Sequence, residues 1–166
     1  MSATLPPAAR LGAALALVAL LGACASAPID TELAPEARRA DAVATAPGTA
    51  TGQVLWGGAI VAARNVGTGT ELEVLSYPLD RSQRPMTGKA SEGRFLIVAD
   101  GYLETVDYAP GRSVTVLGTL DGVREMPVDE ARIPYPVVRS SELHLWRPDD
   151  GARVLPRFSI GIGLGL

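Results

Sequence analysis

The chain has 166 residues with 15 basic and 18 acidic side chains, so its formal net charge is −3 at pH 7. A chain of this length suits one domain, and its acidic balance argues against binding nucleic acid by counterion release at the phosphates. Only two Phe, four Tyr and two Trp are present, so the core must come mainly from Val, Leu, Ile and Ala.

The first 23 residues have the organisation of a bacterial signal peptide. One charge, Arg10, precedes an uncharged run rich in Ala, Leu and Val, as in a basic n-region followed by an apolar h-region. The order Leu21-Gly22-Ala23-Cys24 resembles the bacterial lipobox, in which small residues enter the protease and the thiol accepts diacylglycerol. A membrane-spanning helix fits less well, because it requires about 20 strongly apolar residues and this run stops at Pro28. The sequence also leaves open a general secretory signal with an incidental Cys24, or a buried structural cysteine.

Acylation would make Cys24 the mature amino terminus, and two or three acyl chains anchor stably where one does so only marginally. Ala25 follows the cysteine instead of the Asp that retains Gram-negative lipoproteins in the inner membrane. This resemblance implies delivery to the outer membrane by the lipoprotein sorting machinery. The mature chain would have 143 residues with 14 basic and 18 acidic side chains, a balance of −4, and no free thiol. A disulfide, a catalytic thiol and a thiolate metal site are then excluded.

Residues 24–52 have the composition of a tether, because Ala, Pro and Thr dominate and three prolines interrupt regular structure. As a flexible coil, this segment would let the domain stand roughly 25–30 Å from the lipid. Pro35 to Val43 has the length of two helical turns, which are marginal in isolation and would equally suit packing on the domain.

From Gln53 the sequence changes to short β-like runs separated by turn residues. Gln53 to Val66 is the first run, and the pair Gly57-Gly58 inside it predicts a bulge or a sharp bend. A tight GTGT turn leads to Glu71 to Asp80, where a shift of the apolar phase predicts another bulge or a curled sheet. A polar loop then precedes Arg94 to Ala99, a fully apolar run with the pattern of a buried strand.

Pro110-Gly111 suits the central positions of a type II turn, since Pro fixes φ and Gly accepts a positive φ. The next strand is expected to end at Asp121-Gly122. A loop spaced by Pro127, Pro134 and Pro136 is expected before a last strand broken around Ser140-Ser141. Five or six short, bent strands favour an all-β fold, a small OB-like Greek-key barrel over residues 53–147, rather than a flat sandwich.

Residues 148–166 form a C-terminal tail in which isoleucine and leucine alternate with glycine from Ile160 to Leu166. As a strand, this stretch would have one apolar face and one face of bare backbone. It is expected to lie on the domain as a terminal strand or frayed end, the alternative being contact with a membrane or a partner strand. One strand alone cannot span lipid, because its backbone groups would be unsatisfied.

Few side chains suggest catalysis. His144 is the only histidine, and on a strand it is expected to face outward or pack rather than act as a base or metal ligand. Glu71 and Glu73 share a strand face and offer an acid pair, although the same alternation is typical of the solvated face of a half-buried strand. No G-x-S-x-G elbow occurs, and Asp149-Asp150 lies in an apparent turn. We therefore predict no catalytic residue, no metal site and no cofactor.

Five motifs in register after the lipobox carry a family resemblance: VLWGGAIVAARN, TELEVLSYPLD, GRFLI, YAPGRSVTVLGTLDG and YPVV…LHLW. From Val54 to Trp146 the chain resembles the starvation-inducible outer-membrane lipoprotein family known as Slp. The resemblance implies a lipidated protein on the outer membrane that faces the periplasm and acts in starvation or stress. The family has no established catalytic activity, and Cys24 matches its lipid site. The other matching positions are Trp56, Gly57, Gly58, Glu71, Glu73, Tyr77, Pro78, Arg94, Tyr108, Pro110, Gly111, Arg112 and Gly118.

Three functions remain open, and the favoured one is a non-enzymatic lipoprotein that supports envelope integrity or partner assembly. The alternative is an OB-like binding module for a glycan, a lipid headgroup or a protein partner, since such barrels commonly bind ligands on one face. A hydrolase with an unrecognised site is the third. Exposed clustering of Tyr77, Tyr102 and Tyr108 would favour the binding module. The candidate partner surface comprises Trp56, Tyr77, Arg94, Tyr108 and Arg112. Among these, Trp56 is more typical of a core residue, and the two arginines are more typical of solvated or internally paired side chains.

Overall fold

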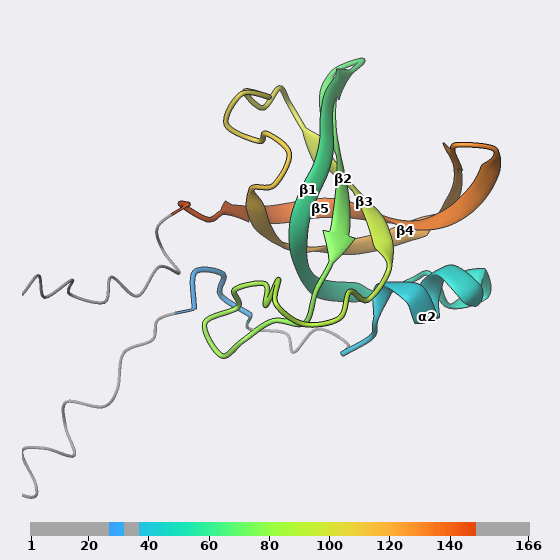
Figure 1. The fold of residues 1–166 in the computed structure, drawn as a ribbon, viewed down its shortest axis with the longest axis horizontal. Helices are drawn as coiled ribbons and strands as arrows, with labels where there is room; N and C mark the ends of the chain where they lie inside the picture. The colour runs from blue at the N-terminus through green and yellow to red at the C-terminus, as the bar shows by residue number, and fades with distance from the viewer. Residues whose placement is uncertain (1–26, 32–36, 149–166) are drawn as a thin grey trace, which may run out of the picture.

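The computed structural model describes residues 27–31 and 37–148 (Figure 1). Five strands close into a barrel in the order β1-β2-β3-β5-β4, and the predicted all-β, OB-like barrel is confirmed. β3 pairs with β5 in parallel, and the other neighbours are antiparallel. The strands are β1 (Gln53–Val66), β2 (Gly69–Ser76), β3 (Arg94–Asp100), β4 (Ser113–Val128) and β5 (Ala131–Leu145). β1 has the predicted bounds, whereas β4 and β5, with 16 and 15 residues, are longer than expected.

Three features of the sequence lie outside the described residues: the lipobox with Cys24, Asp149-Asp150, and the Gly-alternating stretch Ile160 to Leu166. Within the described ranges, no helix has both the length and the apolar character needed to cross a bilayer.

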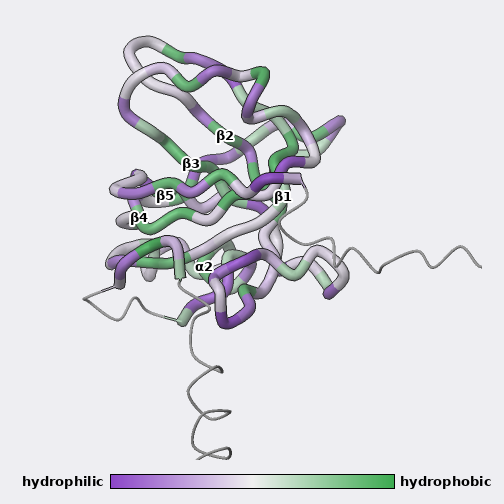
Figure 2. The backbone as a smooth tube through the Cα atoms, turned by 90° about the vertical axis from the view of Figure 1, so that its left-hand side faces the viewer, coloured by the Kyte–Doolittle hydropathy of each residue, from purple (hydrophilic) through white to green (hydrophobic). Residues whose placement is uncertain are grey.

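The barrel interior is filled by alternate residues of every strand, as the period of two requires. Trp56 and Phe95 meet edge to face at a centroid distance of 5.2 Å, and smaller aliphatic side chains surround them. Figure 2 shows hydrophobic positions concentrated along β3, β4 and β5. The buried strand residues of this cluster are Val54, Trp56, Ile60, Leu72, Val74, Phe95, Ile97, Val114, Val116, Leu120 and Val138.

The described part of the expected tether packs on the barrel. The helix α2 (Ala40–Thr45) places Ala40 and Val43 in the core, and the short helix η2 (Pro47–Thr49) follows it. The indole Nε1 of Trp56 donates to the carbonyl oxygen of Arg38 at 2.6 Å. This part of the segment is therefore packed on the domain rather than free as a tether.

The glycine pair in β1 marks a close approach of backbones. Gly57 and Gly58 are both buried, and a Cβ atom on Gly58 would lie 2.0 Å from the carbonyl oxygen of Leu75 in β2. The bulge itself comes later, where the pairing with β2 slips between Ile60 and Ala62. The glycines are needed for the close approach of β1 to its neighbours β2 and β4 rather than for an unusual backbone angle.

β2 is shorter than predicted. It ends at Ser76, and the phase shift around Tyr77 marks the departure of the chain from the sheet rather than a bulge within a strand. Pro78 explains the ending, because proline lacks the N–H that a continuing strand would donate. Beyond it, Leu79 and Pro85 form an isolated bridge within the loop that leads to β3.

β4 and β5 continue past the barrel as a long hairpin, named here the β4–β5 hairpin (residues 121–136). β4 does not end at Asp121-Gly122: Gly122 has φ +82°, the pairing slips between Leu120 and Val123, and the strand runs on. The predicted proline loop is therefore wrong. Each arm has only one paired neighbour, and prolines are accommodated there because a free strand edge needs no N–H donor. The three prolines in this ladder are Pro127, Pro134 and Pro136.

Three local predictions hold. The N–H of Arg112 donates to the carbonyl oxygen of Ala109 at 3.1 Å, and Gly111 between them has φ +87°, as a type II turn requires. The GTGT turn joins β1 to β2 through a two-residue connection with Gly67 at φ +55°. A register shift opposite Leu117 and Gly118 leaves Ser141 unpaired in β5, where a break was expected.

Candidate functional site

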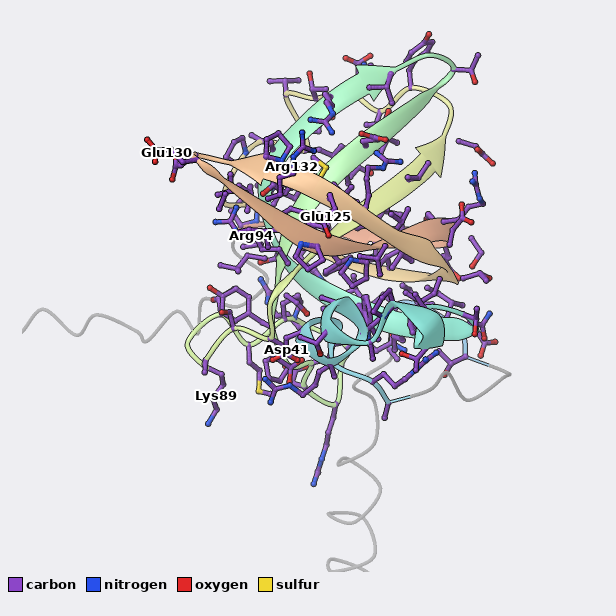
Figure 3. The ribbon with its side chains drawn as sticks, turned by 90° about the vertical axis from the view of Figure 1, so that its right-hand side faces the viewer. Asp41, Lys89, Arg94, Glu125, Glu130 and Arg132 are labelled. Atoms are coloured by element: carbon purple, nitrogen blue, oxygen red, sulfur yellow. The ribbon has the colours of Figure 1, made fainter. Side chains whose placement is uncertain are left out.

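The β4–β5 hairpin folds over the outer face of β2 and β3, and Figure 3 shows it passing in front of these strands with Arg94 beside it. Glu71 of β2 accepts hydrogen bonds from Arg64 of β1 at 2.8 and 3.1 Å. Arg124 of the hairpin donates to its other carboxylate oxygen at 2.5 Å. One acidic side chain thus joins two strands of the barrel to the hairpin above them.

Glu73, two residues further along β2, is held in the same way. Its Oε1 accepts from Nη1 of Arg94 at 2.7 Å and from the hydroxyl of Tyr135 at 2.9 Å. The hydrogen bond with Glu73 raises the pKa of Arg94. Burial, followed by the bond to Glu73, raises the pKa of Tyr135.

A small apolar layer lies beside this polar cluster. Leu96 and Val137 on the outer face of β3 and β5 pack with Tyr135 of the hairpin, and all three are buried. Val98, Met126 and Val128 complete the layer as half-buried neighbours. The strand 2–3 face, on which OB-folds commonly bind oligonucleotides and oligosaccharides, is therefore covered by the chain itself.

The acid pair has the electrostatics of a structural link. Burial raises the pKa of Glu71, but hydrogen bonds and charge from Arg124 and Arg64 outweigh it and hold the pKa below its ordinary value. A carboxyl group held in its ionised form is a poor proton donor at neutral pH. The alternation predicted the shared face of Glu71 and Glu73, whereas their cover comes from residues more than 50 positions later in the chain.

The five residues of the candidate partner surface form no single surface, although Trp56 and Tyr77 line the same cleft. Trp56 is a core residue, and Arg94 lies under the β4–β5 hairpin. Arg112 donates to the carbonyl oxygens of Asp107 and Trp146. Tyr77 and Tyr108 line two different clefts. The hydroxyl of Tyr102 donates to Gly67 at the β1–β2 turn, so the three tyrosines form no common exposed cluster.

The first cleft, of about 250 Å³, lies where residues 37–39 meet the barrel. Tyr77, Leu55 and Leu79 give it apolar walls, and Arg38 and Arg39 give it charge. Asp41 accepts two hydrogen bonds from Arg39 at 2.6 and 3.1 Å, so much of that charge is already paired.

The second cleft, of about 350 Å³, lies between the β3–β4 loop and the bulged part of β5. Tyr108 supplies an aromatic wall, and burial raises the pKa of its hydroxyl. Ser140, Ser141, Glu142 and Asp100 place polar groups around it. A concave site of this size with a few polar groups is suited to a small ligand or a short segment of a partner.

His144 is a packing residue, because its ring lies edge-on to Trp146 at a centroid distance of 4.5 Å. Residues 27–31 and 37–148 contain no group of three His, Cys, Asp or Glu side chains arranged to hold a metal ion.

Sequence reasoning missed a contact between the N-terminal segment and the loop between β2 and β3. The side-chain amide of Gln83 accepts from the N–H of Ile29 at 3.0 Å and donates to its carbonyl oxygen at 2.8 Å. Both residues are buried. The carbonyl oxygen of Gln83 accepts from Thr115 of β4 at 2.7 Å, and that hydroxyl accepts from Trp146 at 2.9 Å. Gln83 lies in a polar loop with no motif around it, so nothing local marks it.

Comparison with known proteins gives a family and two groups of relatives. A sequence model of the outer membrane lipoprotein Slp family matches residues 21–159. Outer membrane protein Slp of Escherichia coli (strain K12) is 35% identical over 125 residues, 73% of this chain and 65% of that protein. The uncharacterized lipoprotein YeaY of the same organism is 32% identical over 105 residues, 63% of this chain and 54% of that protein.

An uncharacterized protein of Haemophilus influenzae is 33% identical over 91 residues, 54% of this chain and 49% of that protein. The chain thus spans about half to two thirds of the length of these curated relatives. Among solved structures, a small single-stranded DNA-binding protein from Streptomyces coelicolor aligns with a TM-score of 0.36 and 14% identity, covering 56% of this chain and 92% of that chain.

Proposed function

Since the chain belongs to the outer membrane lipoprotein Slp family, we propose that it is anchored through acylated Cys24, faces the periplasm and supports the envelope under starvation or stress. The lipoprotein sorting machinery would deliver it there. The observation that carries this proposal is the extent of the family match. It begins at Leu21, the first residue of the lipobox-like order, and continues through the barrel to residue 159. Anchor and barrel therefore belong to one family pattern.

The contacts of the acidic and histidine side chains support a non-enzymatic role. Glu71 and Glu73 are each held by an arginine from a neighbouring strand, and His144 packs against Trp146. Such a barrel acts by being present and oriented at a membrane, where anchoring raises its effective concentration toward its neighbours.

Two experiments test the proposal. Palmitate labelling of the expressed protein is expected to give a labelled, membrane-bound product, and Cys24→Ser is expected to abolish it. Labelling that persists in that variant would refute the lipid site. In a deletion strain under starvation or envelope stress, the anchored protein and its His144→Ala variant are expected to restore survival. A soluble version with an ordinary cleavable signal, at matched periplasmic levels, is expected to fold and fail. Full rescue by the soluble form, or loss of rescue by the histidine variant, would refute the assignment.

The second candidate, a binding module, is favoured by the cleft beside Tyr108, whose size and mixed lining suit a glycan or a short peptide. Titration with soluble peptidoglycan fragments, followed by the fluorescence of the protein, tests it. Saturable binding that Tyr108→Ala removes and Tyr102→Ala leaves intact would support the cleft, and the absence of binding to the parent protein would refute this glycan.

A further inference from the structure

We infer that the contact between Gln83 and Ile29 is a clamp that docks one end of the barrel against the headgroups of the bilayer. The inference rests on the proposed acylation of Cys24. It concerns how the domain sits on the membrane, which the anchor alone leaves open.

The clamp has the features of a built site. Ile29 is 1% exposed, and the amide of Gln83 satisfies both its N–H and its carbonyl oxygen. Gln83 itself adopts φ +64°, a left-handed conformation that a residue with a side chain keeps only where its surroundings determine it. Two sets of contacts hold it here: the turn in which the N–H of Gln83 donates to the carbonyl oxygen of Asp80 at 3.0 Å, and Thr115 of β4, which donates to the carbonyl oxygen of Gln83. The barrel wall, the loop and the N-terminal segment are thus joined through one residue, which bonds Ile29 by its side chain and Thr115 by its backbone carbonyl oxygen.

The short chain between Cys24 and Ile29 limits how the barrel can be oriented on the membrane. Ile29 follows Cys24 by five positions, and a fully extended chain over five residue steps spans at most about 18 Å. The clamped end of the barrel therefore cannot move further than this from an acylated Cys24. The larger distance from the membrane that a flexible tether of 28 residues would allow does not apply, because the N-terminal segment is already attached to the barrel at Ile29.

The position and charge of the clamped end suit a phosphate-bearing surface. Figure 1 shows segment 27–31 beside the loop between β2 and β3, with the turn of the β4–β5 hairpin on the opposite side. Segment 27–31 and the loop of residues 77–93 together carry three basic and three acidic side chains, whereas residues 121–136 of the hairpin carry two basic and four acidic ones. The clamped end is therefore repelled less by an anionic surface than the hairpin is. Of its basic side chains, Arg81 is exposed, and Arg84 stacks on Trp146 at 5.0 Å. Basic residues close to an anionic membrane surface are attracted to it.

The test uses the acylated full-length mature protein in vesicles that contain a headgroup-attached fluorescence quencher. A fluorophore is placed at Gly88→Cys in the loop between β2 and β3, where an added Cβ atom meets open space, or at Glu130→Cys in the hairpin turn. Quenching at position 88 is expected to be several-fold stronger than at position 130. Insertion of about twelve Gly and Ser residues after Ser26 adds roughly 20 Å as a coil and leaves the folded body unchanged. It is expected to make the quenching at the two probe positions similar.

An isosteric variant tests the clamp itself. Gln83→Glu removes the donor to the carbonyl oxygen of Ile29 and is expected to weaken quenching at position 88. Gln53→Glu makes the same charge change on β1 and is expected to have no effect. Equal quenching at both probes of an acylated parent, or an insertion without effect, would overturn the docking. A mature protein whose mass shows no acyl chains would instead refute the proposed function, and the docking with it.

Discussion

Replacing Gly58 by alanine is expected to destabilise the barrel strongly, because the new Cβ atom would lie 2.0 Å from the carbonyl oxygen of Leu75 and 2.7 Å from its carbonyl carbon. Overpacking a core with flexible side chains costs about 1–3 kcal/mol. Here the obstacle is the backbone of β2, which cannot rotate away, so we expect about 3 kcal/mol or more. For a domain of this size that loss lowers the melting temperature by about 12 °C.

A graded series makes the reasoning testable by circular dichroism. An added Cβ atom would lie 2.4 Å from the carbonyl oxygen of Arg139 at Gly118, 2.7 Å from that of Val114 at Gly57, and in open space at Gly88. The loss of stability on substitution by alanine should follow this order, and Gly88→Ala should stay within about 0.5 kcal/mol of the parent. A Gly58→Ala protein that melts within about 2 °C of the parent, or one that is no less stable than Gly88→Ala, would refute the close-approach argument.

Three further substitutions test the contacts outside the barrel core. Glu71→Gln should flatten the dependence of stability on pH. The folded pKa of Glu71 lies below its ordinary value of 4.5, so the ionised carboxylate stabilises the fold above that value. This stabilisation is lost as the pH falls through the folded pKa. Melting curves from pH 7 to pH 3 that run parallel for parent and variant would contradict this. Thr115→Val leaves the carbonyl oxygen of Gln83 and the Nε1 of Trp146 without their buried partner. It should lower the free energy of unfolding in urea by about 1–3 kcal/mol. An unchanged free energy would exclude a stabilising link between the Gln83 loop and β4. Tyr135→Phe keeps the apolar layer but removes the hydroxyl that donates to Glu73. It should lower the free energy of unfolding by about 1 kcal/mol and speed amide hydrogen exchange in the β4–β5 hairpin. Unchanged exchange there would show that the hydroxyl does not hold the hairpin.

Where the determining chemistry is local, the sequence was sufficient to predict the structure. Pro110-Gly111 carries its turn in two residues, because one fixes φ and the other accepts the positive φ that follows. Gly57-Gly58 marked a special position in β1, but the bulge predicted there lies between Ile60 and Ala62, and the glycines instead permit a close approach to neighbouring backbones. The apolar runs that became β1 and β3, and the alternation of Glu71 and Glu73 with apolar residues in β2, identified these strands.

The β4–β5 hairpin could not be predicted, because the signals within it have two meanings. Asp121-Gly122 is a turn signal in isolation and a bulge when both arms continue to pair. Pro134 and Pro136 exclude a central strand, but whether a strand has a free edge depends on where the barrel ends. The cover over Glu71 and Glu73, and the clamp between Ile29 and Gln83, join residues 50 or more positions apart, beyond the reach of any periodicity.

The order of the strands also has a kinetic consequence. β1 must wait for β4, since Gln53 pairs with Thr119, 66 positions later, and the parallel pairing of β3 with β5 needs Val137 to Arg139 near the end of the described chain. Proteins dominated by such distant pairings fold in milliseconds to seconds rather than microseconds. If the proposed signal peptide directs the chain through a translocation channel, this delay would keep the chain unfolded until nearly all of it has emerged, and the barrel would close only afterwards.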